Sequence, residues 1–279
     1  MLKKDKKPIT SLVPQRSVTV DRKKSIFTAI NNYPGRGSDL RGCVNDARAW
    51  KELLEDNYGF NTKIWLDRQV KIVDFIEYFG NIVSDSKASD SIVWTYSGHG
   101  TNVPDRNGDE KDGRDEALCF YDGFLIDDQI KKMFSGIHPQ ASLTFISDSC
   151  HSGTVTRSFL NSVNGEADST PRYLPPEDDF EASLATRSNI TSKSEYSEED
   201  MKEILISGCL PTEFSYDAKI GGNFRGAMSY YAIEVLKRYP VITYENFYNK
   251  LQAALPSSRY AQSPCLEGSS ENKKKIMFK

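Results

Sequence analysis

The chain has 279 residues, of which 38% are hydrophobic, and its formal net charge is −3. That length suits one large domain or two small ones. The slightly negative net charge does not indicate a basic surface for binding nucleic acid. No apolar run approaches the ~20 residues of a membrane span, and the basic N-terminus lacks the apolar segment of a secretory signal, so we expect a cytoplasmic protein that binds neither membrane nor nucleic acid.

The first predicted segment is a basic arm. Residues 1–24 carry eight Lys or Arg against two Asp and show no hydrophobic period, so we expect them to be flexible. Apolar runs of strand length and helical patterns then alternate along the chain. We expect strands at 25–29, 62–66, 91–96, 141–147, 203–208 and 274–278, and helices at 43–58, 70–82, 227–236 and 244–255. This alternation predicts an α/β fold whose mostly parallel sheet is covered by helices on both faces.

One segment interrupts the alternation. Residues 158–200 are rich in Ser, Asn, Thr and Pro and contain ten acidic residues. A connection of this length inside a domain is usually functional or disordered. We therefore predict a long flexible insertion at 158–200.

The five cysteines are widely spaced and form no C-x-x-C pair. This excludes zinc ribbons and thioredoxin-like redox motifs. In a reducing compartment we expect most of them to be free thiols that pack as small hydrophobic residues.

The most reactive residue types follow two of the predicted strands. The run SIVWTY continues into SGHG, which contains His99, and LTFIS continues into DSCHSG, which contains Cys150. Ligands of open α/β sheets bind beyond the carboxyl ends of the strands, so we expect the imidazole and the thiol to share a cleft. A thiol becomes a strong nucleophile when a nearby imidazole takes its proton.

This pair predicts the chemistry of a cysteine peptidase. We interpret Cys150 as the nucleophile and His99 as the base that later protonates the leaving amine. The backbone N–H groups of Gly100 and Cys150 are the expected oxyanion donors. His151 should point away from its neighbour Cys150 and is interpreted as a bystander, and His138 as a surface loop residue. The alternative is that Cys150 is a buried structural thiol and His99 a packing or capping residue.

Through these motifs the sequence resembles the caspase-like cysteine peptidases, and within them the metacaspases of the bacterial type. The separation of His99 and Cys150 is 51 residues, close to the ~50 of a caspase. Further matching segments occur in the family's order: LRGCVNDA (40–47), YSGHGT (96–101), NGDEKDGRDEAL (107–118), IDDQI (126–130), DSCHSGT (148–154), ISGC (206–209), GGNFRGAMSY (221–230) and QSPCLEGS (262–269). The resemblance implies one caspase-like domain at 25–279 with a six-stranded sheet, and endopeptidase activity on protein or peptide substrates.

The resemblance also implies a substrate preference. Caspases carry a Q-A-C motif and cut after Asp, whereas here Asp148 stands two residues before Cys150. Metacaspases cut after Arg or Lys, and an acidic pocket favours such side chains. The family pattern places the pocket for this side chain, the S1 pocket, at Asp46, Ser97 and Asp148. The alternative is that the two acids are helix caps or loop residues.

Calcium is a further expectation of the resemblance, although the chemistry itself requires no cofactor. The loop at 105–116 begins like an EF-hand, but Glu110 stands where that loop needs Gly, and a strand precedes it, so we reject an EF-hand. The family's calcium carboxylates fall on Asp115, Asp127 and Asp128. Arg157 stands where a further ligand is expected, which opposes calcium. The alternative is a solvated acidic loop, with Asp127 capping a short helix that ends at Phe134.

Self-cleavage is the last expectation from the family. Its members often carry cleavage sites in the loop after the nucleophile. The insertion at 158–200 offers Arg172, Arg187 and Lys193 for this role.

Two other enzyme classes are excluded by missing motifs. Leu40 occupies the position where a Rossmann fingerprint needs its third Gly, and neither a P-loop nor a G-x-S-x-G motif occurs. The remaining alternative is a catalytically inactive regulatory or binding module with the same fold. We expect a monomer.

Overall fold

The computed structural model describes residues 23–35, 37–105, 114–150, 168–175, 197–257 and 260–279. A six-stranded sheet runs through its centre in the order β12-β9-β7-β3-β1-β2. Its strands are β1 (Lys23–Ala29), β2 (Asn61–Leu66), β3 (Ser91–Ser97), β7 (Ser142–Asp148), β9 (Ile204–Ser207) and β12 (Cys265–Glu267). The first five run parallel, and β12 pairs antiparallel with β9 at one edge.

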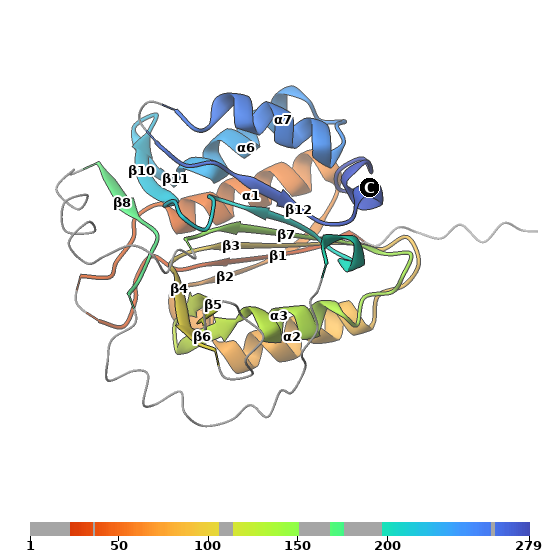
Figure 1. Cartoon of the computed structure of the whole chain (residues 1–279), viewed down its shortest axis with the longest axis horizontal. Coiled ribbons are helices and arrows are strands. Elements are labelled where there is room, and N and C mark those ends of the chain that lie inside the picture. The colour runs from red at the N-terminus through yellow and green to blue at the C-terminus, as the bar shows by residue number, and fades with distance from the viewer. Residues whose placement is uncertain (1–22, 36, 106–113, 151–167, 176–196, 258–259) are drawn as a thin grey trace, which may run out of the picture.

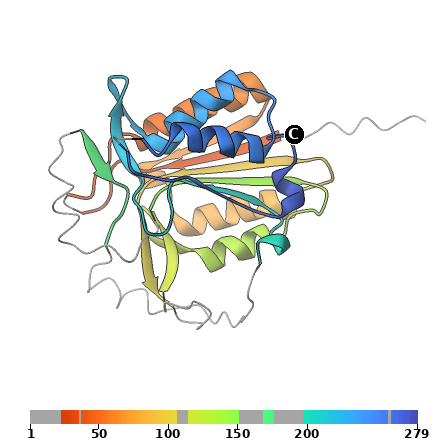
Figure 2. The same cartoon turned by 45° about the horizontal axis from the view of Figure 1, so that its top comes forward.

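Helices cover both faces of this sheet, as Figures 1 and 2 show. One face carries α1 (Cys43–Tyr58), α6 (Ala227–Arg238) and α7 (Tyr244–Ala254), and the other carries α2 (Ile72–Ser84) and α3 (Asp127–Phe134). A short helix, α8 (Ser270–Lys273), lies near the C-terminus. Because both faces are covered, the inner strands are apolar along their length, and every residue of β3 is buried.

Two small antiparallel sheets extend the fold at the end where β3 and β7 finish (Figure 1). One consists of β4 (Gly100–Pro104), β5 (Arg114–Phe120) and β6 (Gly123–Ile126). The other consists of β8 (Ser169–Pro171), β10 (Tyr216–Ile220) and β11 (Asn223–Gly226). These sheets therefore surround the carboxyl ends of the central strands, where ligands of such folds bind.

An aromatic cluster fills the core between the sheet and α2 and α3. Trp94 of β3 stacks on Phe145 of β7 with ring centroids 4.1 Å apart, and Phe75 of α2 lies 4.6 Å from Trp94. All three rings are buried. Large aromatic side chains bury much apolar surface, so this cluster packs α2 firmly against β3 and β7.

The predicted α/β fold with a mostly parallel six-stranded sheet is confirmed. The predicted strand at 274–278 is wrong, because the edge next to β9 is taken by β12, and Ile276 makes only one isolated bridge, with Thr243. The strand predicted to begin at residue 25 begins at Lys23, whose backbone pairs with Ser91. Residues 1–22 of the predicted arm lie outside the described residues, as do 158–167 and 176–196 of the predicted insertion. No helix in the described ranges is long and apolar enough to cross a bilayer.

Candidate active site

The two sequence motifs meet at adjacent strand ends. Ser97 at the end of β3 is in register with Asp148 at the end of β7. His99 lies two residues beyond the end of β3, and Cys150 lies two residues beyond the end of β7. The backbones come so close here that a Cβ on Gly100 would lie 1.8 Å from the carbonyl oxygen of Cys150. Only glycine permits this approach, which explains the Gly that follows His99.

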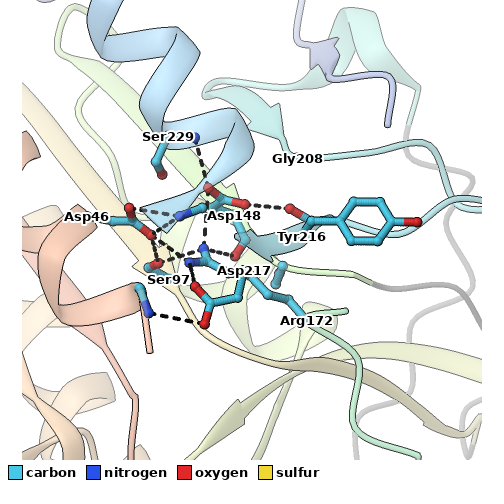
Figure 3. Close-up of polar contacts among 12 residues, drawn as sticks. Asp46, Ser97, Asp148, Arg172, Gly208, Tyr216, Asp217 and Ser229 are labelled. Carbon is cyan, nitrogen blue, oxygen red and sulfur yellow. Dashed lines mark hydrogen bonds and ion pairs between the residues drawn. The ribbon is translucent and has the colours of Figure 1, made fainter. Parts of the chain in front are cut away.

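Acidic side chains converge above these strand ends. The three predicted pocket residues, Asp46, Ser97 and Asp148, lie together and are buried (Figure 3). The Ser97 hydroxyl donates a hydrogen bond of 2.8 Å to Asp46. A fourth residue, Asp217 of β10, completes the group and is also buried. The pocket thus contains three carboxylates.

The chain's own Arg172 fills this pocket (Figure 3). Its Nη2 lies 2.7 Å from Asp46 Oδ2 and 3.3 Å from Asp217 Oδ1. Its Nη1 donates to the Ser97 hydroxyl at 2.8 Å and to the Asp148 carbonyl at 3.0 Å, and lies 3.3 Å from Asp148 Oδ2. The guanidinium is completely buried. A buried cation of this kind requires paired charges, and the pocket supplies them at both terminal nitrogens, whereas Nε has no hydrogen-bond partner among the described residues.

The carboxylates are oriented by backbone donors as well as by Arg172. Asp46 accepts from the N–H of Gly226, and Asp148 accepts from the N–H of Ser229. Asp217 accepts from two N–H groups at the start of α1, those of residues 41 and 42, at 2.6 and 3.1 Å. The acidic groups are therefore held in place by the surrounding backbone, which leaves oxygen atoms facing the guanidinium.

Burial and charge shift the pKa values in the pocket. Burial raises the pKa of Asp46 to about 6, although the positive charge of Arg172 opposes the shift. Burial alone would lower the pKa of Arg172, but the negative charges around it, above all that of Asp148, raise the pKa well above its ordinary value. Arg172 is therefore charged at neutral pH.

The backbone of Arg172 lies at the two predicted oxyanion donors. Its carbonyl oxygen accepts hydrogen bonds from the N–H of Gly100 at 2.9 Å and from the N–H of Cys150 at 3.2 Å. Its own N–H donates to the carbonyl oxygen of Ser215 at 2.9 Å. The strand that precedes Arg172, β8, pairs antiparallel with β10. The segment is thus bound as an extended strand with its arginine in the acidic pocket.

His99 is held as a neutral base beside this carbonyl. Its Nε2 lies 2.8 Å from the carbonyl oxygen of Ser38, which can only accept, so Nε2 carries the proton. Nδ1 is buried and, among the described residues, has no hydrogen-bond partner. Burial lowers the pKa of His99 to about 4; the hydrogen bond to Ser38 opposes the shift, and the charge of Arg172 adds to it. The lone pair of Nδ1 is therefore free to accept a proton at neutral pH.

The thiol of Cys150 faces Ser215. Its Sγ accepts a hydrogen bond from the N–H of Ser215 at 2.8 Å and lies 3.3 Å from the Ser215 carbonyl oxygen. Within the described part of the chain, no hydrogen bond joins this Sγ to His99. The structure therefore brings together the backbone of Cys150, the imidazole of His99 and the Arg172 carbonyl, with the thiol turned to one side.

Three residues of the site were missed by the sequence analysis. Asp217 is the third carboxylate, Ser215 binds both Arg172 and the thiol, and Gly226 forms a wall of the pocket. A Cβ on Gly226 would lie 2.5 Å from Nη1 of Arg172, so a larger residue would take the space of the guanidinium. The sequence carries no signal for Asp217, because its strand, YDAKI, mixes polar and apolar residues and shows no period that would indicate a buried acid.

Other predicted residues lie elsewhere or outside the described ranges. Asp127 begins α3 and pairs with Lys131 at 2.6 Å, Asp115 is buried in β5, and Asp128 follows Asp127 in α3. No group of three or more His, Cys, Asp or Glu side chains in the described residues is arranged to hold a metal ion. His138 lies half-buried in a turn, where its Nδ1 accepts from the N–H of residue 140. The predicted residues outside the described ranges are His151, Arg157, Arg187 and Lys193. All five cysteines are free, where most were predicted to be.

Comparison with known proteins identifies the family. The family model for the metacaspase peptidase C14 domain matches residues 23–158. Metacaspase-1 of Scheffersomyces stipitis is 30% identical to the chain, over 92% of the chain and 73% of the relative. Metacaspase-1 of Emericella nidulans is 29% identical over 91% of the chain and 72% of the relative.

A solved structure supports the same fold. The crystal structure of a Geobacter sulfurreducens protein superposes with a TM-score of 0.69 at 22% identity, and the match covers 92% of this chain and 98% of that one. This likeness concerns the fold alone. The chain belongs to the metacaspase family of cysteine peptidases.

Proposed function

We propose that this protein is a cysteine endopeptidase that cleaves peptide bonds after arginine and, less efficiently, after lysine. The observation that carries the proposal is the position of Arg172. Its side chain is paired with three carboxylates, and its carbonyl oxygen lies between the N–H groups of Gly100 and Cys150. A substrate residue preceding a cleaved bond needs this combination of a side-chain pocket and two donors at its carbonyl.

The protein takes part in both stages of the reaction, the acylation of Cys150 and the hydrolysis of the resulting thioester. His99 takes the thiol proton of Cys150 at Nδ1, and the thiolate attacks the carbonyl carbon while the N–H groups of Gly100 and Cys150 stabilise the oxyanion. The imidazolium then gives its proton to the departing amine, and the C–N bond breaks, which leaves a thioester on Cys150. Water, deprotonated by His99, hydrolyses the thioester and restores the thiol. Before the attack, the thiol must turn about its Cα–Cβ bond, away from Ser215.

Arginine should be preferred because the pocket contacts both terminal nitrogens. Nη1 and Nη2 of Arg172 have separate sets of acceptors, with Ser97 and Asp148 on one side and Asp46 and Asp217 on the other. A lysine ammonium carries one nitrogen and cannot reach both sets at once. Charge alone still favours lysine over a neutral side chain.

An inactive binding module is the second candidate. The observation in its favour is the thiol of Cys150, which bonds to Ser215 and not to His99. Such a module would bind basic segments in the acidic pocket without cutting them. The intact pair of His99 and Cys150 and the family membership favour the peptidase.

Peptide hydrolysis tests the proposal directly. Fluorogenic peptides ending in Arg should be cut fastest, those ending in Lys more slowly, and those ending in Asp or Gln not measurably. Cys150→Ala should lower activity by about 10³-fold or more, whereas Cys265→Ala, which removes a free thiol from β12, should not. Parallel assays with calcium and with a chelator test the calcium expectation. Arg peptides that are bound but never cut would support the binding module instead.

The acidic pocket predicts a pH dependence of the KM. A bound guanidinium favours ionised Asp46, so its pKa of about 6 in the filled pocket is lower than in the empty one. The KM for an Arg peptide should therefore rise as the pH falls from 8, and the rise should level off below pH 6. The kcat should hold down to about pH 5, because burial lowers the pKa of His99 to about 4 in the filled site. A kcat that falls with a midpoint near 6.5 would contradict this account.

Self-cleavage follows from the same geometry. Of the three basic residues predicted for this role, Arg172 is bound in the manner of a substrate, so the bond between Arg172 and Tyr173 is the one we propose to be cut. The described residues place no other arginine in the acidic pocket.

Intact-mass analysis of the purified chain tests the site of cleavage. On incubation we expect two fragments, which end at Arg172 and begin at Tyr173. Cys150→Ala should yield neither, and Arg172→Gln should remove this cut while leaving cleavage of added Arg peptides in place. Fragments that begin at other residues, with the bond after Arg172 intact, would show that the bound segment is not a substrate.

A further inference from the structure

The chain beyond Arg172 is also bound, on the side of the leaving group. Tyr173 forms a parallel bridge with Gly100, and the N–H of Leu174 donates to the Gly100 carbonyl oxygen at 3.0 Å. Gly100 therefore binds the segment twice. Its N–H donates to the carbonyl oxygen of Arg172, which precedes the bond proposed to be cut. Its carbonyl oxygen accepts from the N–H of Leu174, which follows that bond. The contacts of Tyr173 and Leu174 lie beyond the arginine, so the acidic pocket does not account for them.

The side chain of Tyr173 lies in an aromatic cluster of its own. It is 8% exposed and packs with Cys150, Cys209 and Phe214 in a small hydrophobic group separate from the main core. The rings of Tyr173 and Phe214 are 6.4 Å apart at 52°, and Phe214 in turn lies 6.5 Å from Tyr216. Ring pairs at such distances and angles are attractive beyond the area that they bury. Burial raises the pKa of Tyr173, as expected for a phenol removed from water.

We propose that Cys209, Phe214 and Tyr216 form a subsite for the residue that follows the cleaved bond, and that the subsite takes an aromatic side chain. The protein is then directed to Arg–aromatic bonds inside extended chains, rather than to any exposed arginine. This inference rests on the proposed peptidase function but adds a specificity that the acidic pocket cannot supply. Residue 173 plays the part of this aromatic residue within the chain itself.

The subsite predicts an effect on the acylation step alone. The residue after the bond departs with the amine, so its contacts act up to the breaking of the C–N bond and not during hydrolysis of the thioester. A buried ring exchanged for a methyl group loses more apolar contact than a single methylene, which already changes discrimination about tenfold or more. We therefore expect at least about a tenfold difference in kcat/KM between an aromatic residue and alanine.

Internally quenched hexapeptides provide the test. The full-length protein should cut Ser-Thr-Pro-Arg-Tyr-Leu and its Phe analogue at least about ten times more efficiently than the Ala analogue, measured as kcat/KM. Mass analysis should place every cut after the arginine. Equal kcat/KM for the Tyr and Ala peptides, with Cys150-dependent cleavage of both, would overturn the subsite and leave the proposed function standing. Failure to cut any of the peptides would instead count against the proposed function.

Three variants separate loss of the subsite from general loss of activity. The readout is the kcat/KM for the Tyr peptide divided by that for the Ala peptide. In Phe214→Ala this ratio should fall to about 1, as expected without the subsite, and Phe214→Leu should give an intermediate ratio. Leu210→Ala changes an exposed residue of the same connection between β9 and β10 and should keep the full ratio. Because the readout is a ratio measured on one enzyme, partial loss of folded protein does not alter it. An unchanged ratio in Phe214→Ala would overturn the assignment of Phe214.

Discussion

The ion pairing of Arg172 with Asp46, Asp148 and Asp217 is the interaction that holds the segment around residue 172 in the site. Three carboxylates in one buried space repel one another, and burial already raises the pKa of Asp46 to about 6. A guanidinium offsets this repulsion, and it brings with it the backbone that reaches Gly100 and Cys150. The acidic pocket and the backbone of Cys150 are thus linked through a single arginine residue.

The pocket is prepared for this cation by the fold. Each carboxylate comes from a different element, α1, the end of β7 and β10, and each accepts from backbone N–H groups of another segment. Such donors fix the oxygen atoms before any arginine arrives and cost little reorganisation when it binds. Because Gly226 has no side chain, it leaves space for the guanidinium of Arg172. The negative charge of the pocket is therefore a property of the tertiary structure and not of one loop.

Much of this arrangement could be predicted from the sequence, because it depends on strand ends. The runs that end at Ser97 and Asp148 are apolar and of strand length, and parallel strands deliver their next residues to one edge. That logic placed His99, Gly100 and Cys150 near one another. Asp217 could not be found in this way, since its strand β10 belongs to a small sheet whose short, mixed sequence has no clear period. The thiol rotamer of Cys150 depends on Ser215, which is 65 residues away in sequence, and no local pattern carries such a contact. The false strand at 274–278 is apolar only because Met277 and Phe278 anchor the C-terminus in the core.

Binding of benzamidine, a small guanidinium-like cation, tests the central claim most directly. Titration calorimetry would compare Cys150→Ala, which lacks the proposed nucleophile, with the double variant Cys150→Ala, Arg172→Gln. If Arg172 occupies the acidic pocket, the double variant should bind benzamidine at least about tenfold more tightly, because the ligand no longer competes with a tethered arginine. Arg187→Gln in place of Arg172→Gln should leave the affinity unchanged. Equal affinities in the chains with and without Arg172 would contradict the account.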